Sequence, residues 1–496
     1  MPLNDIIANS KLEKGFSKAG FNRSSNTLLF SGFSFIFIAL SAVIAASFVT
    51  SQSSALFIGV AAALGAYMAL NIGANDVANN VGPAVGAKAL TMIGALVMAA
   101  VFESAGAILA GGDVVNTISK GIIDPAMVSS PQTFIWLMMA ALVSAALWVN
   151  LATWLGAPVS TTHSIVGGVA GAGIAAAGFT SVDWGELGRI AASWVISPVL
   201  GGILAALVLA LIHKVIVYQD NKIIAARRWV PILIAMMATA FGAYLAIKGV
   251  KKIHSFDFME SIIIGLVMGG LAWLISLPLI RRQSRGIPNT NESLNTLFKY
   301  PLIISAALLC FAHGANDVAN AIGPLAAIVS TLQSGIIQAQ VSIPFWVMLI
   351  GAFGISFGLI LFGPKLVRMV GQQITKLNPM RAFCVALSAA TTVIIASWLA
   401  LPVSSTHIAL GGVFGVGFFR EWYNAHSKTR KAYIRRNSGR TPEPHERVES
   451  NPDIRKRRFL VRRQNFMTII TAWVITVPSA ALLSATVFFT LSSIWG

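Results

Sequence analysis

The chain has 496 residues, of which 56% are hydrophobic and only 11% charged. About one quarter of the residues in an ordinary soluble domain are charged, so this composition excludes a globular protein with a water-facing surface. The formal net charge of +18 would suggest nucleic-acid binding in a soluble protein, but here the basic residues gather in short segments beside apolar runs. Because that distribution is typical of membrane topology, we predict an all-α polytopic membrane protein without a nucleic-acid partner.

Apolar runs of about 20 residues, the length that crosses a bilayer as a helix, recur along the chain. The polar segment 1–28 is predicted to be cytoplasmic, and 29–54 to contain a retained first span and a short loop. Later spans are predicted near 55–80, 85–111, 133–155, 158–179, 188–213, 229–248, 258–280, 299–329, 341–363, 380–402, 404–420 and 465–492. The sequence therefore predicts about 12–13 membrane segments.

Lys and Arg residues near the ends of spans tend to stay in the cytoplasm. They concentrate here in the stretches 11–23, 214–228, 281–299 and 420–463. With all four inside, the N-terminus is cytoplasmic and the C-terminus lies outside, and we expect a plasma (inner) membrane. The segment 214–298 is interpreted as a linker with two spans and basic cytoplasmic loops. The polar segment 421–463 is interpreted as a flexible basic cytoplasmic insertion.

Two motifs occur twice in the same order. GANDVANNVGP at 73–83 returns as GANDVANAIGP at 314–324 with an offset of 241 residues, and ATWLGAPVSTTH at 152–163 returns as ASWLALPVSSTH at 396–407 with an offset of 244. The chain is therefore interpreted as two transport repeats, 55–213 and 299–492. In the predicted topology the two copies run in opposite directions. Inverted repeats whose broken or re-entrant helices meet at the midplane are typical of secondary transporters.

The first motif places polar residues within an apolar span, where their burial costs free energy. Helical spacing places Asn75, Asp76 and Asn79 on one face, and the second copy repeats them as Asn316, Asp317 and Asn320. Such residues inside a membrane favour function by default. We expect the amides to bind substrate and the aspartates to bind the coupling cation, since carboxylate and amide oxygens suit hard cations. The alternative is a polar hinge whose side chains only bond one another.

A Gly-Pro pair follows each Asn-Asp motif. Gly82-Pro83 and Gly323-Pro324 are expected to interrupt their helices and to free backbone groups that protein, ion or water must satisfy.

The second motif places a proline and small hydroxyl residues before a Gly-rich helix. Ser160 or Thr161 is predicted to be an N-cap. A helix that begins inside the membrane directs N–H groups and its positive dipole end at whatever lies ahead, which is a ready anion site. The candidate anion-binding hydroxyls are those of Ser160, Thr161, Thr162, Ser404, Ser405 and Thr406. Ordinary bonding of these hydroxyls to helix carbonyls is the alternative.

Four further ionisable residues lie in apolar spans. His163 and His407 sit one turn into their helices and are either structural hydrogen-bonding residues or have a proton or substrate role. His313 precedes the second Asn-Asp motif, has no counterpart in the first, and is a candidate titrating group. Glu103 is a lone carboxylate in an apolar span, and we expect it to take part in ion coupling.

The predicted anion site has no Lys or Arg close by in the sequence. Helix ends, hydroxyls and amides must stabilise the anion while two aspartates repel it, and accompanying cations would resolve that conflict. Each charge moved across 100 mV is worth about 2.3 kcal/mol, so a divalent anion entering an inside-negative cell needs at least two cations to break even. Symport is the physical expectation.

The two duplicated motifs resemble the signatures of the inorganic phosphate transporter family (PiT). The resemblance implies an inverted-repeat importer of inorganic phosphate, coupled to sodium in some members and to protons in others. It implies that Asp76 and Asp317 serve cation coupling, that the two hydroxyl-rich turns hold phosphate, and that Glu103 matches an important glutamate. Ala386 stands where sodium-coupled animal members have a second glutamate. Sodium is favoured over the proton, and that departure leaves the coupling ion open.

Rival functions remain at this stage. A permease for sulfate or another tetrahedral oxyanion would use the same fold, although protonated phosphate can donate a hydrogen bond to a buried carboxylate and sulfate cannot. A passive anion channel would show no cation dependence. An intramembrane hydrolase lacks a Gly-x-Ser-x-Gly elbow, so no enzyme and no cofactor beyond the co-transported ion are expected. The oligomeric state stays open, a homodimer included.

Overall fold

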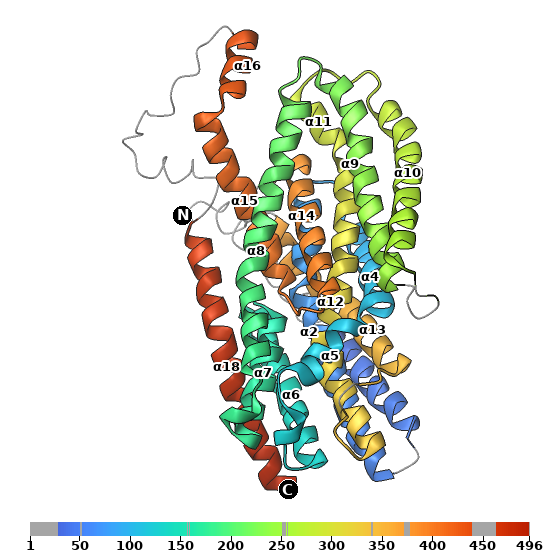
Figure 1. The fold of residues 1–496 in the computed structure, drawn as a ribbon, viewed down its shortest axis with the longest axis vertical. Coiled ribbons are helices and arrows are strands. Elements are labelled where there is room, and N and C mark those ends of the chain that lie inside the picture. The colour runs from blue at the N-terminus through green and yellow to red at the C-terminus, as the bar shows by residue number, and fades with distance from the viewer. Residues whose placement is uncertain are drawn as a thin grey trace, which may run out of the picture.

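The computed structural model describes residues 28–49, 52–155, 157, 159–249, 254, 256–338, 341–371, 377–438 and 463–495. Within these residues the secondary structure is helical, apart from one isolated β-bridge (Figure 1). Eleven of the described helices have the length and hydropathy to cross a membrane. The predicted all-α polytopic class is confirmed.

The helices follow the predicted spans closely, because long apolar runs leave little freedom in where a spanning helix begins and ends. The eleven span-length segments and the two motif helices α7 and α15 are Leu28–Ser47, α2 (Gln52–Asn75) with α3 (Val77–Gly86), α4 (Met92–Ala110), α6 (Pro131–Leu155), α7 (Thr161–Ala177), α8 (Trp184–Ile212), α9 (Lys222–Tyr244), α10 (Phe258–Gln283), α12 (Lys299–Ser334), α13 (Phe345–Met369), α14 (Pro379–Trp398), α15 (Ser405–His426) and α18 (Arg463–Trp495). The described residues also include the short α-helices α5 (Gly112–Asn116), α11 (Asn291–Leu297) and α16 (Lys428–Ser438), and short π- or 3-10 helices η1 (Thr117–Gly121), η2 (Pro125–Met127), η3 (Phe179–Ser181), η4 (His213–Val217) and η5 (Leu245–Gly249).

The expected interruption at the Gly-Pro pairs is wrong. The first motif breaks instead at Asp76, between α2 and α3, and α3 continues through Pro83. The second motif lies in one continuous helix, α12, that includes Pro324. A proline removes one helical hydrogen bond, and the surrounding helices hold the chain in place despite that loss.

The glycines of these pairs serve close packing. A Cβ added to Gly82 would lie 2.9 Å from Val370 Cγ1, and one added to Gly323 would lie 3.0 Å from Ile118 Cγ2. Both distances are too short for ordinary contact, so a side chain at either position would push the neighbouring segment away.

The predicted flexible insertion 421–463 is helical over its first part. Helix α15 continues to His426, and α16 follows. Lys222 Nζ donates to the hydroxyl of Tyr433 at 2.5 Å, and Arg436 forms an ion pair with Asp220. These contacts dock α16 on the loop between α8 and α9. The rest of the insertion, 439–462, lies outside the described residues.

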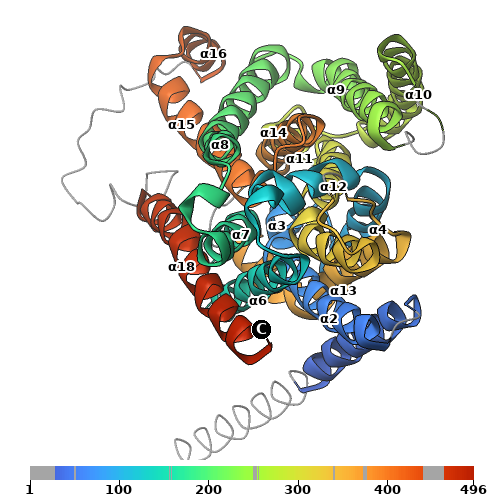
Figure 2. The ribbon, with the colours of Figure 1, turned by 60° about the horizontal axis from the view of Figure 1, so that its bottom comes forward.

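The two motif-bearing halves interlock. Helix α2 packs on α13 and α4 on α12, while α7 packs on α18 and α15 on α8. A Cβ at Gly73 would overlap the Ile355 carbonyl oxygen, and a Cβ at Gly314 would overlap that of Glu103, so the helices touch backbone to backbone at matching places. Figure 2 shows α12 and α3 enclosed by other helices, with α18 and α10 at the periphery. The inverted sense of the two repeats stays a prediction.

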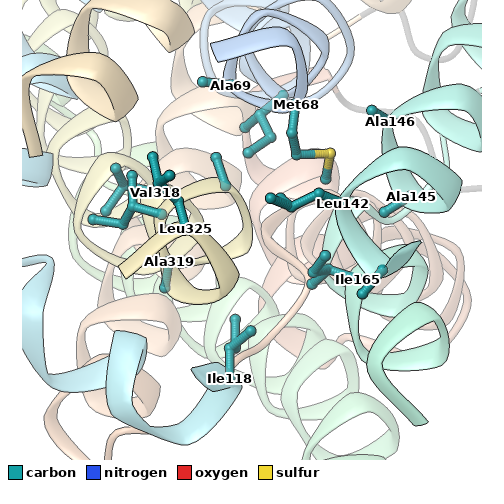
Figure 3. Packing of buried hydrophobic residues seen from close by; sticks show 14 of the residues in the cluster. Met68, Ala69, Ile118, Leu142, Ala145, Ala146, Ile165, Val318, Ala319 and Leu325 are labelled. Carbon is teal, nitrogen blue, oxygen red and sulfur yellow. The ribbon is translucent and has the colours of Figure 1, made fainter. Parts of the chain in front are cut away.

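The interior is packed with apolar side chains from both halves. Met68 of α2, Leu142 of α6, Ile165 of α7 and Leu325 of α12 meet there without exposed surface (Figure 3). Burial of this kind fixes the position of the motif helices relative to one another. The polar motifs are therefore held in a rigid frame.

Candidate functional site

Asp76 lies where the two halves meet. Its Oδ2 accepts a hydrogen bond from Thr161 Oγ1 at 2.7 Å, and its Oδ1 accepts one from Thr406 Oγ1 at 3.0 Å. Thr161 begins α7 and Thr406 lies in the first turn of α15. The side chain of Asp76 is 2% exposed. One buried carboxylate thus joins two helix N-termini that come from different repeats.

Those two helix starts are built alike. Ser160 caps α7, its hydroxyl accepting from the His163 N–H at 3.1 Å, and Ser404 caps α15, accepting from the His407 N–H at 3.3 Å. The predicted N-cap at Ser160 is confirmed. The caps satisfy the N–H groups at the third helical position and leave those at the first two positions without an intrahelical partner. Four N–H groups, of Thr161, Thr162, Ser405 and Thr406, remain for an anion.

Asn75 and Asn316 hold the loops that lead into these helices. Asn75 Nδ2 donates to Thr153 Oγ1 at 2.8 Å and to the Ala157 carbonyl at 3.4 Å. In the second half Asn316 Nδ2 donates to Ser397 Oγ at 3.0 Å and to the Leu401 carbonyl at 3.1 Å, and Asn316 Oδ1 accepts from the Val403 N–H at 3.2 Å. The amide of Asn316 is fully used by the protein, so its part is to position the loop.

Asn79 and Asn320 make the reciprocal contacts between halves. Asn79 Nδ2 donates to Thr406 Oγ1 at 2.9 Å. Asn320 Nδ2 donates to Thr162 Oγ1 at 3.1 Å and to Thr161 Oγ1 at 3.2 Å. Each asparagine therefore secures the helix start of the other repeat. The side-chain N–H groups of both asparagines thus donate to protein, whereas their Oδ1 atoms accept no hydrogen bond from the described residues.

Asp317 belongs to a chain of charged and polar groups. Its Oδ2 accepts from Ser405 Oγ at 3.2 Å and lies 2.9 Å from His313 Nε2. His313 Nδ1 lies 2.5 Å from Glu103 Oε2, and Asn80 Nδ2 donates to Glu103 Oε1 at 2.9 Å. Glu103, 210 residues before His313, is thereby linked to the site, as its expected coupling role requires.

The buried oxygens at this site outnumber the donors offered to them. The Oδ1 atoms of Asn75, Asn79, Asn320 and Asp317 have no hydrogen-bond partner among the described residues. Buried acceptors are normally satisfied, and free carboxylate and amide oxygens are the ligands that hard cations prefer. Ligand atoms of Asp76, His313 and Asp317 also lie within 4.8 Å of one another. The donor set therefore fits a bound cation such as sodium.

Prolines add to this surplus of acceptors. Pro83 and Pro324 have no N–H to donate to the carbonyls of Asn79 and Asn320, four residues earlier in their helices. Both helices thus continue through the Gly-Pro pair, but the backbone N–H that would normally donate to the carbonyl of each asparagine is absent. The predicted freeing of backbone groups holds without an interruption of either helix.

The two motif histidines face each other. The rings of His163 and His407 lie 4.7 Å apart, edge to face, and the His163 ring lies 3.9 Å from that of Trp194. Trp194 Nε1 donates to the Pro402 carbonyl at 3.1 Å. These contacts pack the first turns of α7 and α15 together, which favours a structural part for both histidines.

The polar contacts above involve amides, hydroxyls, carboxylates and one histidine, and no Lys or Arg takes part in them among the described residues. Three contributors were not predicted from the sequence: Asn80, Thr153 and Ser397. Thr153 and Ser397 stand at matching places in the second motif pair, and that match was the available signal. Asn80 has Ala321 as its counterpart, so the repeat could not reveal it.

Comparison with known proteins shows the family of this chain. The model of the phosphate transporter family matches residues 72–484. A protein of Helicobacter pylori described as "Putative phosphate permease" is 43% identical, the alignment covering 97% of this chain and 98% of that protein. A protein of Pyrococcus abyssi with the same description is 36% identical over 86% of this chain and 95% of that protein.

The fold of this chain is also similar to that of a solved structure. The chain is similar to a protein described as "The sodium-dependent phosphate transporter", with a TM-score of 0.77, 34% identity, and coverage of 88% of this chain and 99% of that one. With a family model over most of the chain, long relatives and a matching fold, the chain is a multi-pass membrane protein and belongs to the phosphate transporter family.

Proposed function

We propose that the protein imports inorganic phosphate together with cations, with sodium as the coupling ion. The observation that carries this proposal is the position of Asp76, which accepts hydroxyl hydrogen bonds from the first turns of both α7 and α15. An anion held by those helix ends lies beside a carboxylate of like charge, so a cation between them stabilises both. The description of the similar solved structure as sodium-dependent supports sodium.

Phosphate and cation use different atoms of the site in this proposal. The N–H groups at the starts of α7 and α15 bind phosphate oxygens, as helix N-termini bind anions elsewhere. Sodium is bound by the carboxylates of Asp76 and Asp317 and by the free amide oxygens of Asn79 and Asn320, whose N–H groups are engaged with protein. The asparagines predicted to bind substrate are thus assigned to the cation and to the loops.

Transport then follows alternating access between two inverted repeats. The reciprocal contacts of Asn79 with Thr406 and of Asn320 with Thr162 would break and re-form as the halves move. We place the protein in the plasma (inner) membrane with its N-terminus in the cytoplasm, since the basic segments then lie inside.

Uptake of radiolabelled phosphate into proteoliposomes, with sodium and pH gradients imposed separately, tests the proposal. We expect uptake under an inward sodium gradient that an inside-negative potential accelerates. Uptake that ignores sodium and follows outside acid would assign the coupling to protons. Uptake without dependence on either cation would show a passive anion channel.

Sulfate is the second candidate substrate within the same fold. Protonated phosphate can donate to a carboxylate such as that of Asp317, whose Oδ1 accepts no hydrogen bond from the described residues, whereas sulfate at neutral pH has no proton to donate. We expect tenfold excess sulfate to leave phosphate uptake nearly unchanged. Sulfate uptake that phosphate does not inhibit would overturn the substrate assignment.

A further inference from the structure

A small hollow adjoins the site at Asn79. It lies at the seam between α14 and α15. Helix α15 continues from there toward the basic helix α16 (Figure 1). The lining residues of the hollow are Asn79, Pro83, Val370, Val385, Ala409, Leu410 and Val413. Apart from Asn79 the lining is apolar. The basic segments place this side in the cytoplasm.

Three basic side chains stand farther along the same seam. Arg381 lies in the first turn of α14, one helical turn before Val385, and Arg420 lies two turns after Val413 in α15. His213 follows α8, and its ring lies 6.1 Å from Phe419 and 5.2 Å from Tyr423, which flank Arg420 closely in sequence. Since α14 and α8 both pack on α15, the three side chains gather at one end of the bundle.

This group differs from basic residues that only set topology. Arg281 and Arg282, at the end of α10, are exposed, whereas Arg381 and Arg420 are half-buried. His213 is 9% exposed, and its Nδ1 has no hydrogen-bond partner among the described residues. Burying the two guanidinium groups beside one another is unfavourable unless an anion joins them.

Neither Arg381 nor Arg420 forms an ion pair with a described Asp or Glu, and the two guanidinium groups repel each other. Glu421, next to Arg420, offsets part of that charge. The group still carries an excess of positive charge. In addition, the first turn of α14, capped by Asn378, contributes its positive dipole end.

The other repeat has no such group. With the 244-residue offset of the second motif, the positions of Arg381 and Arg420 correspond to Leu137 and Ala176. The scaffold itself therefore does not require arginine at these places. The two arginines thus occur only in the second repeat, at the cytoplasmic end through which imported phosphate would leave.

We propose that Arg381, Arg420 and His213 form a second site for a phosphate-type oxyanion, which receives transported phosphate at the cytoplasmic end of the α14–α15 seam. Guanidinium groups suit this ligand because their N–H groups match phosphate oxygens in pairs. The identity of the ligand as transported phosphate rests on the proposed function. The phosphate of an anionic lipid headgroup has the same chemistry, and the exposed Phe418 and Trp422 lie close to it in sequence.

Protection of the arginines from modification tests this site without transport. Purified full-length protein in nanodiscs is treated with phenylglyoxal, and mass spectrometry quantifies modified Arg381 and Arg420, with exposed Arg281 as the internal control. In neutral lipid we expect millimolar inorganic phosphate, but not chloride, to slow modification of Arg381 and Arg420 several-fold and to leave Arg281 unchanged. Protection by anionic lipid alone, indifferent to phosphate, would assign the site to lipid. Protection by neither would overturn it.

Transport from each face tests the function of the site. In the variant Arg381→Gln/Arg420→Gln, the KM for phosphate presented at the cytoplasmic face of inside-out vesicles should rise at least about tenfold, the factor for roughly 1.4 kcal/mol. The KM at the outer face should stay within twofold, and Arg281→Gln should alter neither. An equal change at both faces would overturn the one-sided site. Wild-type protein that transports no phosphate, yet shows phosphate protection, would overturn the proposed function alone.

Discussion

The two aspartates occupy equivalent places in the repeats but have different neighbours. Asp317 adjoins His313, which contacts Glu103. At the matching places around Asp76 the chain has Ile72, by the 241-residue offset, and Ile355, whose carbonyl meets Gly73 as that of Glu103 meets Gly314.

The helix packing around the two aspartates is thus duplicated, whereas the ionisable pair of His313 and Glu103 occurs only beside Asp317. Asp76 relies on hydroxyls from both halves, whereas Asp317 relies on one hydroxyl and an ionisable chain. The two carboxylates therefore need not perform the same task, and Asp76, which contacts both halves, is the more central of the two.

Removing either carboxylate charge should have the largest effect. Asp76→Asn and Asp317→Asn keep the size of the side chain but remove a cation ligand, so coupled uptake should fall at least about 100-fold, equivalent to roughly 2.7 kcal/mol. Phosphate uptake normalised to inserted protein measures this. Size-exclusion profiles matching wild type would show that folding is intact. Unchanged uptake in both variants would remove the aspartates from the mechanism.

The unequal neighbours allow a matched pair of variants. Glu103→Gln retains an acceptor for Asn80 but removes the charge facing His313, and we expect uptake to fall about tenfold, a loss of roughly 1.4 kcal/mol, with an altered pH profile. Ile355→Val, at the equivalent place, removes one buried methylene at a cost of about 1 kcal/mol in stability and should leave uptake within twofold. Phosphate uptake is measured as a function of pH for both variants. Equal losses would mean that packing, not charge, matters at these positions.

Hydroxyl deletions refine the comparison between the aspartates. Thr406→Val removes the donor to Asp76 and the acceptor for Asn79, two contacts between halves. Ser405→Ala removes one donor, to Asp317. At about 1 kcal/mol for each buried hydrogen bond, the sodium concentration for half-maximal uptake should rise roughly thirtyfold in Thr406→Val, which loses two bonds, and roughly fivefold in Ser405→Ala, which loses one. The reverse order would make Asp317 the more important cation ligand.

The smallest effect is expected away from both aspartates. Lys248 forms an ion pair with Asp113, linking the segment after α9 to the first repeat, and both side chains are partly exposed. Partly exposed pairs contribute about 0–1 kcal/mol, so Lys248→Met should shift thermal unfolding by a few degrees at most and leave uptake unchanged. A large loss of uptake would show that this linker takes part in the motion of the halves.

The sequence predicts the helices well because a spanning segment needs a long apolar run, and such runs are visible in the composition. It also predicts the cap at Ser160, which depends on local spacing. The single helical face expected for Asn75, Asp76 and Asn79 stays a prediction, since the helix breaks at Asp76. The sequence does not predict the pairing of Glu103 with His313, because contacts between distant helices depend on tertiary packing. The predicted interruption at the Gly-Pro pairs was wrong for the same reason. Neighbouring residues such as Val370 hold the helix in place at a proline where the local sequence alone favours its end.

The crossed amide contacts of Asn79 and Asn320 have a consequence for the history of the chain. Because each repeat secures the helix start of the other, a polypeptide with a single copy of the motifs would lack half of every such contact. A half-length ancestor could have built these contacts by pairing two chains. Gene fusion would then have freed each copy to diverge, and the unequal surroundings of the two aspartates are what such divergence leaves behind.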